Sequence, residues 1–84
     1  METILVEPFS DGWAVRTETV ANEMVFLSGA DAEDAARALA YRLAAAGEPV
    51  RLRLTLRSGT AAARFVCLPP IDGEATPQLV RSVV

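Results

Sequence analysis

Four arginines between residues 51 and 64 have a spacing that suits anion binding. Arg51, Arg53 and Arg57 alternate with apolar residues and Arg64 follows a turn, so a β-hairpin would project their guanidinium groups from one face. This pattern indicates a site for an anion or an acidic partner at Arg51, Arg53, Arg57 and Arg64, with Arg16 as a further candidate. The alternative is a solvated face whose charge is neutralised by Glu7, Glu18 or Glu23 on neighbouring strands.

Cys67 is the one thiol in the chain, and the sequence contains no histidine to activate it. We predict that Cys67 is buried and inert. A single cysteine forms no internal disulfide, and Asp31, Glu33 and Asp34 lack the spacing of a metal-binding loop, so they are assigned to a helix start. Glycine-rich phosphate loops and hydrolase-type serine motifs are absent from the sequence. We therefore predict a protein that is not an enzyme and has no metal or cofactor.

Two aromatic residues have both a structural and a functional interpretation. Trp13 follows Gly12 at the start of a predicted strand, where its ring either closes the end of the core or stacks on a base. Tyr41 falls on the outer side of a predicted helix, away from Leu39 and Leu43. It is either a single exposed aromatic residue or a contact for a partner.

Length and charge limit the class of protein. A chain of 84 residues with 51% apolar residues is expected to form one domain over residues 1–84. The net charge of −3 gives no overall attraction to nucleic acid or to an anionic membrane. We expect no membrane association and a cytoplasmic location, because no basic leader region precedes the first apolar run and no uncharged run approaches membrane-spanning length.

The strongest strand pattern lies in residues 50–68, which predict a β-hairpin with a two-residue turn at Ser58-Gly59. This turn fixes the register. It places Val50 opposite Cys67, Leu52 opposite Phe65 and Leu56 opposite Ala61 on a buried face. On the other face, it places Arg53 directly opposite Arg64.

Three earlier strands are predicted at residues 2–7, 13–19 and 24–27. Ile4 and Val6 form the apolar side of the first strand, and Pro8 is expected to end it. The continuous apolar run at residues 24–27 is typical of a strand that is covered on both faces, so we expect it to be central in the sheet.

A helix is predicted from Ser28 to about Ala46, because Ser28 with Asp31 fits a capping box and Gly47 suits the left-handed position after a helix. Asp31 with Asp34 is the rival start. The predicted apolar stripe consists of Ala32, Ala35, Ala36, Leu39, Leu43 and Ala46. Residues 69–84 begin as a connector, and Thr76-Pro77 can open a short docked helix, with a loose tail as the alternative.

Three short motifs resemble a known family: Val6-Glu7-Pro8, Asp11-Gly12-Trp13-Ala14-Val15-Arg16, and Asp34-Ala35-Ala36-Arg37. The chain is similar to a family of small bacterial proteins described as a domain of unknown function, whose members combine V-x-P, G-W-x-V-K/R, a capped alanine-rich helix and a hairpin. The resemblance implies the same fold and carries no catalytic or binding residues. The family has basic residues where this chain has Glu18 and Glu23.

These observations predict a two-layer α+β domain in the order ββ(β)-α-ββ, with an antiparallel-rich sheet, one main helix on one face and either a short C-terminal helix or a tail. We expect a non-enzymatic protein-interaction module that acts as a homodimer or as a subunit of a small complex. Its interface is expected to include Tyr41, Val66 and Leu68. The alternative is a weak nucleic-acid or anion binder that uses the arginine stripe.

Overall fold

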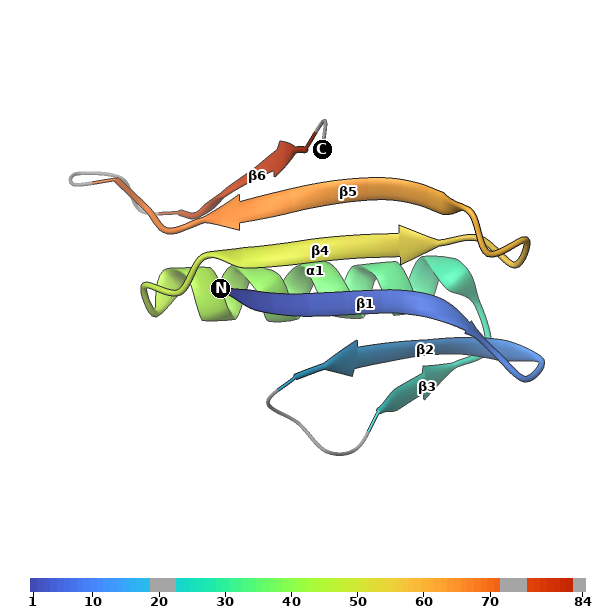
Figure 1. The fold of residues 1–84 in the computed structure, drawn as a ribbon. Coiled ribbons are helices and arrows are strands. Elements are labelled where there is room, and N and C mark those ends of the chain that lie inside the picture. Colours follow the sequence, from blue (N-terminus) through green and yellow to red (C-terminus); the bar gives the residue numbers. More distant parts are fainter. Residues whose placement is uncertain (19–22, 72–75, 83–84) are drawn as a thin grey trace.

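The computed structural model describes residues 1–18, 23–71 and 76–82 of the chain, which form six strands and one helix (Figure 1). In chain order the elements are β1 (Glu2–Phe9), β2 (Gly12–Thr17), β3 (Met24–Phe26), α1 (Gly29–Ala45), β4 (Val50–Thr55), β5 (Ala61–Leu68) and β6 (Gln78–Arg81).

The strands form one sheet in the order β3-β2-β1-β4-β5-β6. All neighbouring strands are antiparallel except β1 and β4, which are parallel. A parallel pair needs a crossover connection, and α1 provides it by packing across β1, β2 and β4 on one side of the sheet (Figure 1). The predicted two-layer α+β architecture is therefore confirmed.

The helix begins where the capping pattern predicts. The hydroxyl of Ser28 accepts a hydrogen bond of 3.1 Å from the backbone N–H of Asp31, which satisfies one of the free donors at the helix start. The rival start at Asp31 is wrong, because Asp31 already lies in the first turn. At the other end Gly47 has φ +100°, the left-handed conformation that glycine adopts without strain.

The buried face of α1 differs from the predicted stripe. Its fully buried residues are Ala32, Ala36, Ala40 and Ala44, whereas Leu39 and Leu43 are only partly buried. The prediction of Ala46 on this face is wrong, because Ala46 is exposed at the C-cap of the helix. Residues four apart share one line along a helix, and a line made only of alanine lets the helix approach the sheet most closely. The two leucines then flank this line.

The core lies between α1 and the sheet. Its largest fully buried side chains are Ile4, Val6, Val15, Val50, Leu52 and Cys67. Trp13 packs against this cluster from one end, and Gly29 is close enough that an added Cβ would lie 3.1 Å from Cε2 of the tryptophan. Trp13 therefore closes the end of the core, as one of its two interpretations predicts.

The register of the β4–β5 hairpin is confirmed from Val50 to Leu54, including the direct pair of Arg53 and Arg64. The turn itself is wrong. The N–H of Leu56 donates to the carbonyl of Thr60 (2.9 Å) and that of Gly59 donates to the carbonyl of Leu56 (2.9 Å), which gives a three-residue loop.

The conformation of Gly59 explains this difference. A two-residue hairpin turn requires positive φ at its first central residue, here Ser58, and a serine adopts that conformation only at a cost. In the three-residue loop the residue with positive φ is Gly59 (+88°) and not Ser58. A register shift between Leu54 and Thr55 accommodates the extra residue as a β-bulge, so Leu56 is 48% exposed rather than paired with Ala61.

The prediction that residues 24–27 form a covered central strand is wrong. β3 has three residues and lies at the edge of the sheet, next to β2 only. Val25 is 56% exposed and Leu27 is 93% exposed. This run therefore leaves apolar side chains exposed at the edge of the sheet, where a partner could cover them.

The predicted C-terminal helix is also wrong. The segment forms β6, which pairs antiparallel with β5 through Val66 and Val80 and through Cys67 and Leu79. The pattern Gln78-Leu79-Val80-Arg81 alternates with the period of a strand, and Leu79 packs against the core on the helix side. Val83 and Val84 lie outside the described residues.

β1 continues through Pro8 to Phe9, beyond its predicted end. The pairing of β1 with β4 stops at Val6. Pro8, which has no backbone N–H, therefore lies where β1 needs no donor toward β4, and the strand can continue through it. The second strand spans Gly12–Thr17, and residue 19 of its predicted range lies outside the described residues.

Within the described ranges, no helix combines the length and the apolar character that crossing a bilayer requires.

Candidate anion-binding site

The face of the sheet that points away from α1, here called the open face, carries a row of basic residues. Arg53 lies in register with Leu5 of β1 on one side and with Arg64 of β5 on the other. Arg51 precedes Arg53 by two residues on β4 and therefore projects from the same face. All three arginines are exposed. The register thus collects three guanidinium groups from two adjacent strands.

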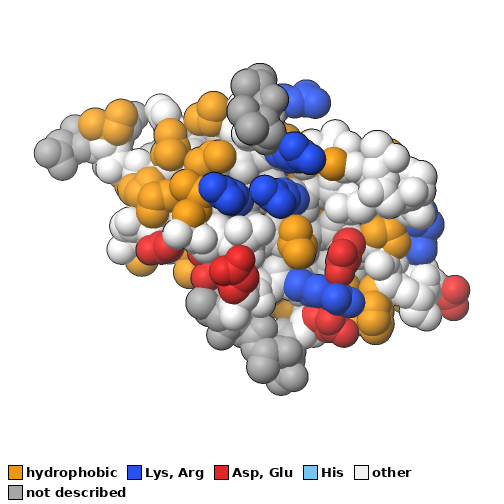
Figure 2. Space-filling view, in the orientation of Figure 1, with side chains coloured by type: hydrophobic (Ala, Val, Ile, Leu, Met, Phe, Trp, Pro, Cys, Tyr) orange, Lys and Arg blue, Asp and Glu red, His pale blue; other side chains and the backbone are white. Residues whose placement is uncertain are grey.

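These arginines line a shallow pocket of about 370 Å³, here called the arginine groove. Its walls include Arg51, Arg53, Arg64, Met1, Val66 and Ser82. Figure 2 shows blue side chains grouped on this face beside an area of hydrophobic side chains. The groove therefore combines positive charge with an apolar wall.

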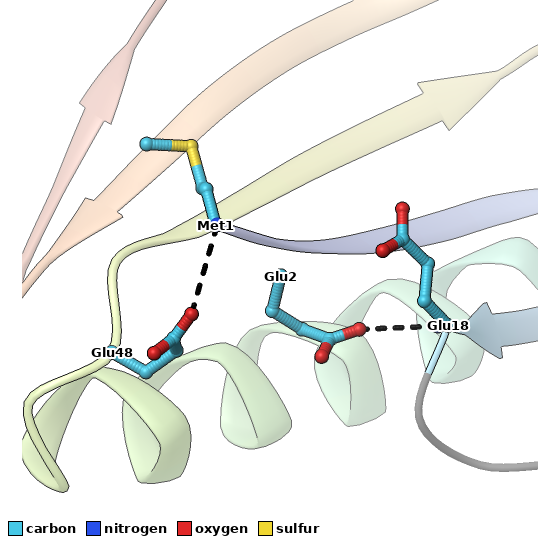
Figure 3. Close-up of polar contacts among 4 residues, drawn as sticks. All are labelled: Met1, Glu2, Glu18 and Glu48. Atoms are coloured by element: carbon cyan, nitrogen blue, oxygen red, sulfur yellow. Dashed lines mark hydrogen bonds and ion pairs between the residues drawn. The ribbon is translucent and has the colours of Figure 1, made fainter.

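Met1 reaches the groove because the start of the chain is held in place. Its amino group lies 3.8 Å from Oε1 of Glu48, in the connection between α1 and β4 (Figure 3). In the next residue, Oε1 of Glu2 accepts a hydrogen bond of 3.1 Å from the backbone N–H of Glu18 (Figure 3). Since Glu2 is only 8% exposed, this bond satisfies one of its otherwise buried oxygens.

Among the described residues, no carboxylate lies within ion-pair distance of Arg51, Arg53 or Arg64. Two of the three glutamates expected to neutralise them are instead close to Arg16. The Nε of Arg16 lies 3.0 Å from Oε1 of Glu7 and 3.0 Å from Oε2 of Glu23.

The N–H at this nitrogen forms a well-directed hydrogen bond with neither oxygen, so the contacts are ion pairs only. The guanidinium of Arg16 also lies over the ring of Phe9, 5.7 Å from its centroid. The charge of Arg16 is therefore compensated within the protein. Arg16 does not extend the arginine groove as a free positive group.

Arg57 does not join the other three arginines. Its Nη1 donates to the carbonyl of Ser10 (3.1 Å) and its Nη2 donates to the carbonyl of Gly12 (2.9 Å). Its guanidinium carbon lies 5.2 Å from the centroid of the Trp13 ring. Arg57 therefore ties the β4–β5 loop to the β1–β2 turn, because the three-residue loop moves it out of the strand alternation.

The contact with Arg57 also bears on the second interpretation of Trp13. The guanidinium of Arg57 lies over the indole ring, and Gly29 of α1 lies close to Cε2 and Cζ2 of the same ring. A nucleic-acid base would have to displace one of these neighbours in order to stack on it. The described arrangement therefore favours the structural role of Trp13.

The predicted interface residues lie on two different surfaces. Tyr41 is 38% exposed on α1, on the opposite layer from the open face. Val66 lines the arginine groove, and Leu68, which is 40% exposed, follows it by two residues on the same face. Only Val66 and Leu68 can therefore contribute to one binding surface with the arginines.

Sequence reasoning missed two residues in the walls of the groove, Met1 and Ser82, and one beside it, Val80. Val80 lies directly opposite Val66 and is 45% exposed, and Ser82 donates its backbone N–H to the carbonyl of Arg64 (2.7 Å). Val80 and Ser82 were missed because residues 76–84 were expected to form a short helix or a tail rather than a strand. The alternation from Gln78 to Arg81 was the available signal.

A smaller pocket of about 160 Å³ lies between the start of α1 and the end of the hairpin. Its walls include Val6, Trp13, Leu54, Leu56 and Glu33. The carboxylate of Glu33 accepts a hydrogen bond of 3.0 Å from Nε of Arg37. Most of the other wall residues are apolar, and the one acid already has a cationic partner. The pocket therefore offers mainly apolar surface.

Cys67 is fully buried opposite Val50, as the register predicts. Burial raises the pKa of its thiol, which favours the neutral form over the nucleophilic thiolate. In the described part of the chain, no three histidine, cysteine, aspartate or glutamate side chains are grouped to hold a metal ion.

Comparison with protein-family models, with curated proteins and with solved structures gives no match to this chain. A function can therefore be inferred only from the geometry of the described residues, of which the arginine groove is the most distinctive feature.

Proposed function

We propose that this protein is a non-enzymatic interaction module that binds an anionic partner in the arginine groove. The observation that carries the proposal is the direct pairing of Arg53 with Arg64, without a carboxylate within ion-pair distance among the described residues. Like charges directly opposite each other destabilise a sheet. A bound anion would turn this repulsion into two attractive contacts.

The residue type also supports this function. A guanidinium group offers a planar set of donors that matches the two oxygens of a carboxylate or phosphate, and it loses less hydration than an ammonium group on binding. Arg51 adds a third group along the same strand. The groove therefore supplies several donors at fixed positions on a sheet rather than on a mobile loop.

A binding titration tests this function. The probe is fluorescein-labelled hexaglutamate, and its anisotropy is followed at 20 mM and 200 mM salt. We expect saturable binding that weakens at the higher salt concentration, because ions screen exposed charges. Arg64→Ala is expected to reduce the affinity by about tenfold, which corresponds to about 1.4 kcal/mol.

The matched control is Arg42→Ala, which removes the same charge from an exposed position near the end of α1, on the opposite layer. We expect nearly unchanged binding for this variant. Equal losses for both variants would show that net charge, rather than the groove, determines binding. That result would contradict the proposed function.

A second candidate function is self-association, which the exposed apolar residues beside β6 favour. Val80, Leu68 and Ile71 are 45%, 40% and 66% exposed, and β6 lies at one edge of the sheet that the described residues form. An edge strand can pair with the same strand of a second copy. Light scattering should then give a dimer mass that falls on dilution, whereas a monomer mass at high micromolar concentration would contradict it.

A further inference from the structure

The walls of the arginine groove restrict the chemistry of its partner beyond simple negative charge. We infer that the groove binds an extended polypeptide segment that has acidic side chains at two alternate positions and an apolar side chain two residues before them. This inference rests on the proposed function and names the class of its partner.

The spacing of the arginines matches an extended peptide. Arg51 and Arg53 are two residues apart on β4, which separates their Cα atoms by about 6.6–6.8 Å in a strand. Acidic residues at positions i and i+2 of an extended peptide have the same separation and project from the same side. Two carboxylates of such a segment therefore fit over Arg51 and Arg53 when the segment runs along β4 in the same direction, so that a residue before the acids lies beyond Arg51.

Arg64 strengthens one of these two positions. It lies directly across from Arg53, so a carboxylate at this level can accept hydrogen bonds from two guanidinium groups. Arg51 is instead paired with Val66. The two acidic positions therefore differ: one faces two arginines and the other faces one arginine beside an apolar residue.

The apolar wall begins level with Arg51, where Val66 lies opposite this arginine and Val80 lies across from Val66. It continues beyond Arg51 to Leu68, two residues further along β5 on the same face, and to the exposed Met1 at the start of β1. An apolar side chain of the partner, two residues from its first acid, would lie over this wall. Its burial there adds to binding in proportion to the area removed from water.

Nucleic acid fits these walls less well. Single-stranded nucleic acid is usually held by aromatic rings on which its bases stack. Phe65 contributes to the groove, but its ring packs on the helix side, where the guanidinium of Arg37 lies 5.2 Å from its centroid. Phe9 is next to Arg16 and Trp13 is next to Arg57. In the described residues, therefore, no ring is available to a base in the groove.

Three labelled probes test this inference on the full chain at 20 mM salt: the peptide Val-Thr-Glu-Thr-Glu-Thr, the same peptide with serine in place of valine, and a twelve-nucleotide oligo(dT). We expect the valine peptide to bind at least fivefold more tightly than the serine peptide. Arg64→Ala should weaken both peptides by about tenfold.

The apolar wall is tested separately with Leu68→Ser, which changes the exposed side chain two residues before the level of Arg51. This variant should remove the advantage of the valine peptide and leave the serine peptide unchanged. Leu27→Ser is the matched control, because this leucine is 93% exposed and lies beyond β3, at the other edge of the sheet. We expect it to affect neither peptide.

The outcomes separate this inference from the function on which it rests. Binding of oligo(dT) alone, lost in Arg64→Ala, would overturn the peptide inference and leave an anion-binding groove. Equal binding of the two peptides would overturn the assignment of the apolar position. Absence of binding by all three probes would overturn both the inference and the proposed function.

Discussion

Replacing Arg64 with alanine should stabilise the folded protein at low salt, since it removes one half of a like-charged pair. Arg53 and Arg64 are directly opposite each other, and described carboxylates do not reach them. Long side chains on such a pair can lean apart to a charge separation of about 7 Å, at which two unit charges in water repel by about 0.6 kcal/mol.

Salt changes this repulsion by a predictable amount. With a Debye length of about 30 Å at 0.01 M and about 3 Å at 1 M, the repulsion falls from about 0.5 kcal/mol to below about 0.1 kcal/mol. For a domain of this size, 0.5 kcal/mol corresponds to a change in Tm of about 2–4 °C. The gain from Arg64→Ala should therefore be measurable at low salt and nearly absent at high salt.

Alanine also changes strand propensity and removes the aliphatic part of the arginine, so a double-mutant cycle is needed. Urea unfolding of wild type, Arg53→Ala, Arg64→Ala and the double variant gives the coupling energy at each salt concentration. We expect a repulsive coupling at 0.01 M that disappears at 1 M. A coupling of zero at low salt, or an attractive one, would refute the claim that the groove is strained without a partner.

Three further predictions concern the elements that support the groove. Arg57→Ala should lower the free energy of unfolding by about 1–2 kcal/mol, because it removes two charge-assisted hydrogen bonds and the contact with Trp13; urea midpoints that match those of Arg42→Ala would contradict this role. Burial raises the pKa of the Cys67 thiol, so the thiol of the unfolded chain, with its ordinary pKa of about 8.5, loses its proton at a lower pH than the thiol of the folded chain. The free energy of unfolding should therefore be constant below that pH and should decline as the pH rises from there through the pKa of the folded protein. Cys67→Ala should show a smaller decline between pH 7.5 and 9.5, and equal declines in urea midpoints would disprove the assignment. Deletion from residue 76 onward should lower the Tm, because it removes β6 and uncovers the edge of β5; an unchanged Tm would show that β6 adds no stability.

Local sequence patterns predict the central hairpin and the helix well. The alternation of residues 50–57 indicates β4, and Arg53 lies opposite Arg64 as predicted because the bulge next to Leu54 offsets the extra residue of the loop. Ser28 and Gly47 likewise mark the two ends of α1 correctly. These features depend on short-range geometry, which neighbouring residues determine almost completely.

Features that depend on tertiary position could not be derived in the same way. The apolar run before Ser28 looks like a central strand, but its position in the sheet depends on β1 pairing with β4 instead. Residues 76–82 begin with a helix-type Thr-Pro start, yet pairing with the free edge of β5 determines their conformation. Here tertiary contacts outweigh local preference.

In the candidate site as well, strand alternation predicts some residues correctly, whereas the position of others depends on tertiary contacts. Three of the four predicted arginines share the groove, because strand alternation places them there. Arg57 does not, since the loop has one residue more than the predicted turn and allows this side chain to reach the β1–β2 turn. Met1 and Val80 come from distant parts of the chain, and only the sheet order brings them to Val66.

A titration of the ¹⁵N-labelled protein with the peptide Val-Thr-Glu-Thr-Glu-Thr, followed by amide chemical shifts, would locate the binding site residue by residue. We expect the largest shift changes at Arg51, Arg53, Arg64 and Val66, and we expect Arg64→Ala to reduce them greatly. Shift changes concentrated on α1, or equal changes in wild type and Arg64→Ala, would contradict binding in the arginine groove.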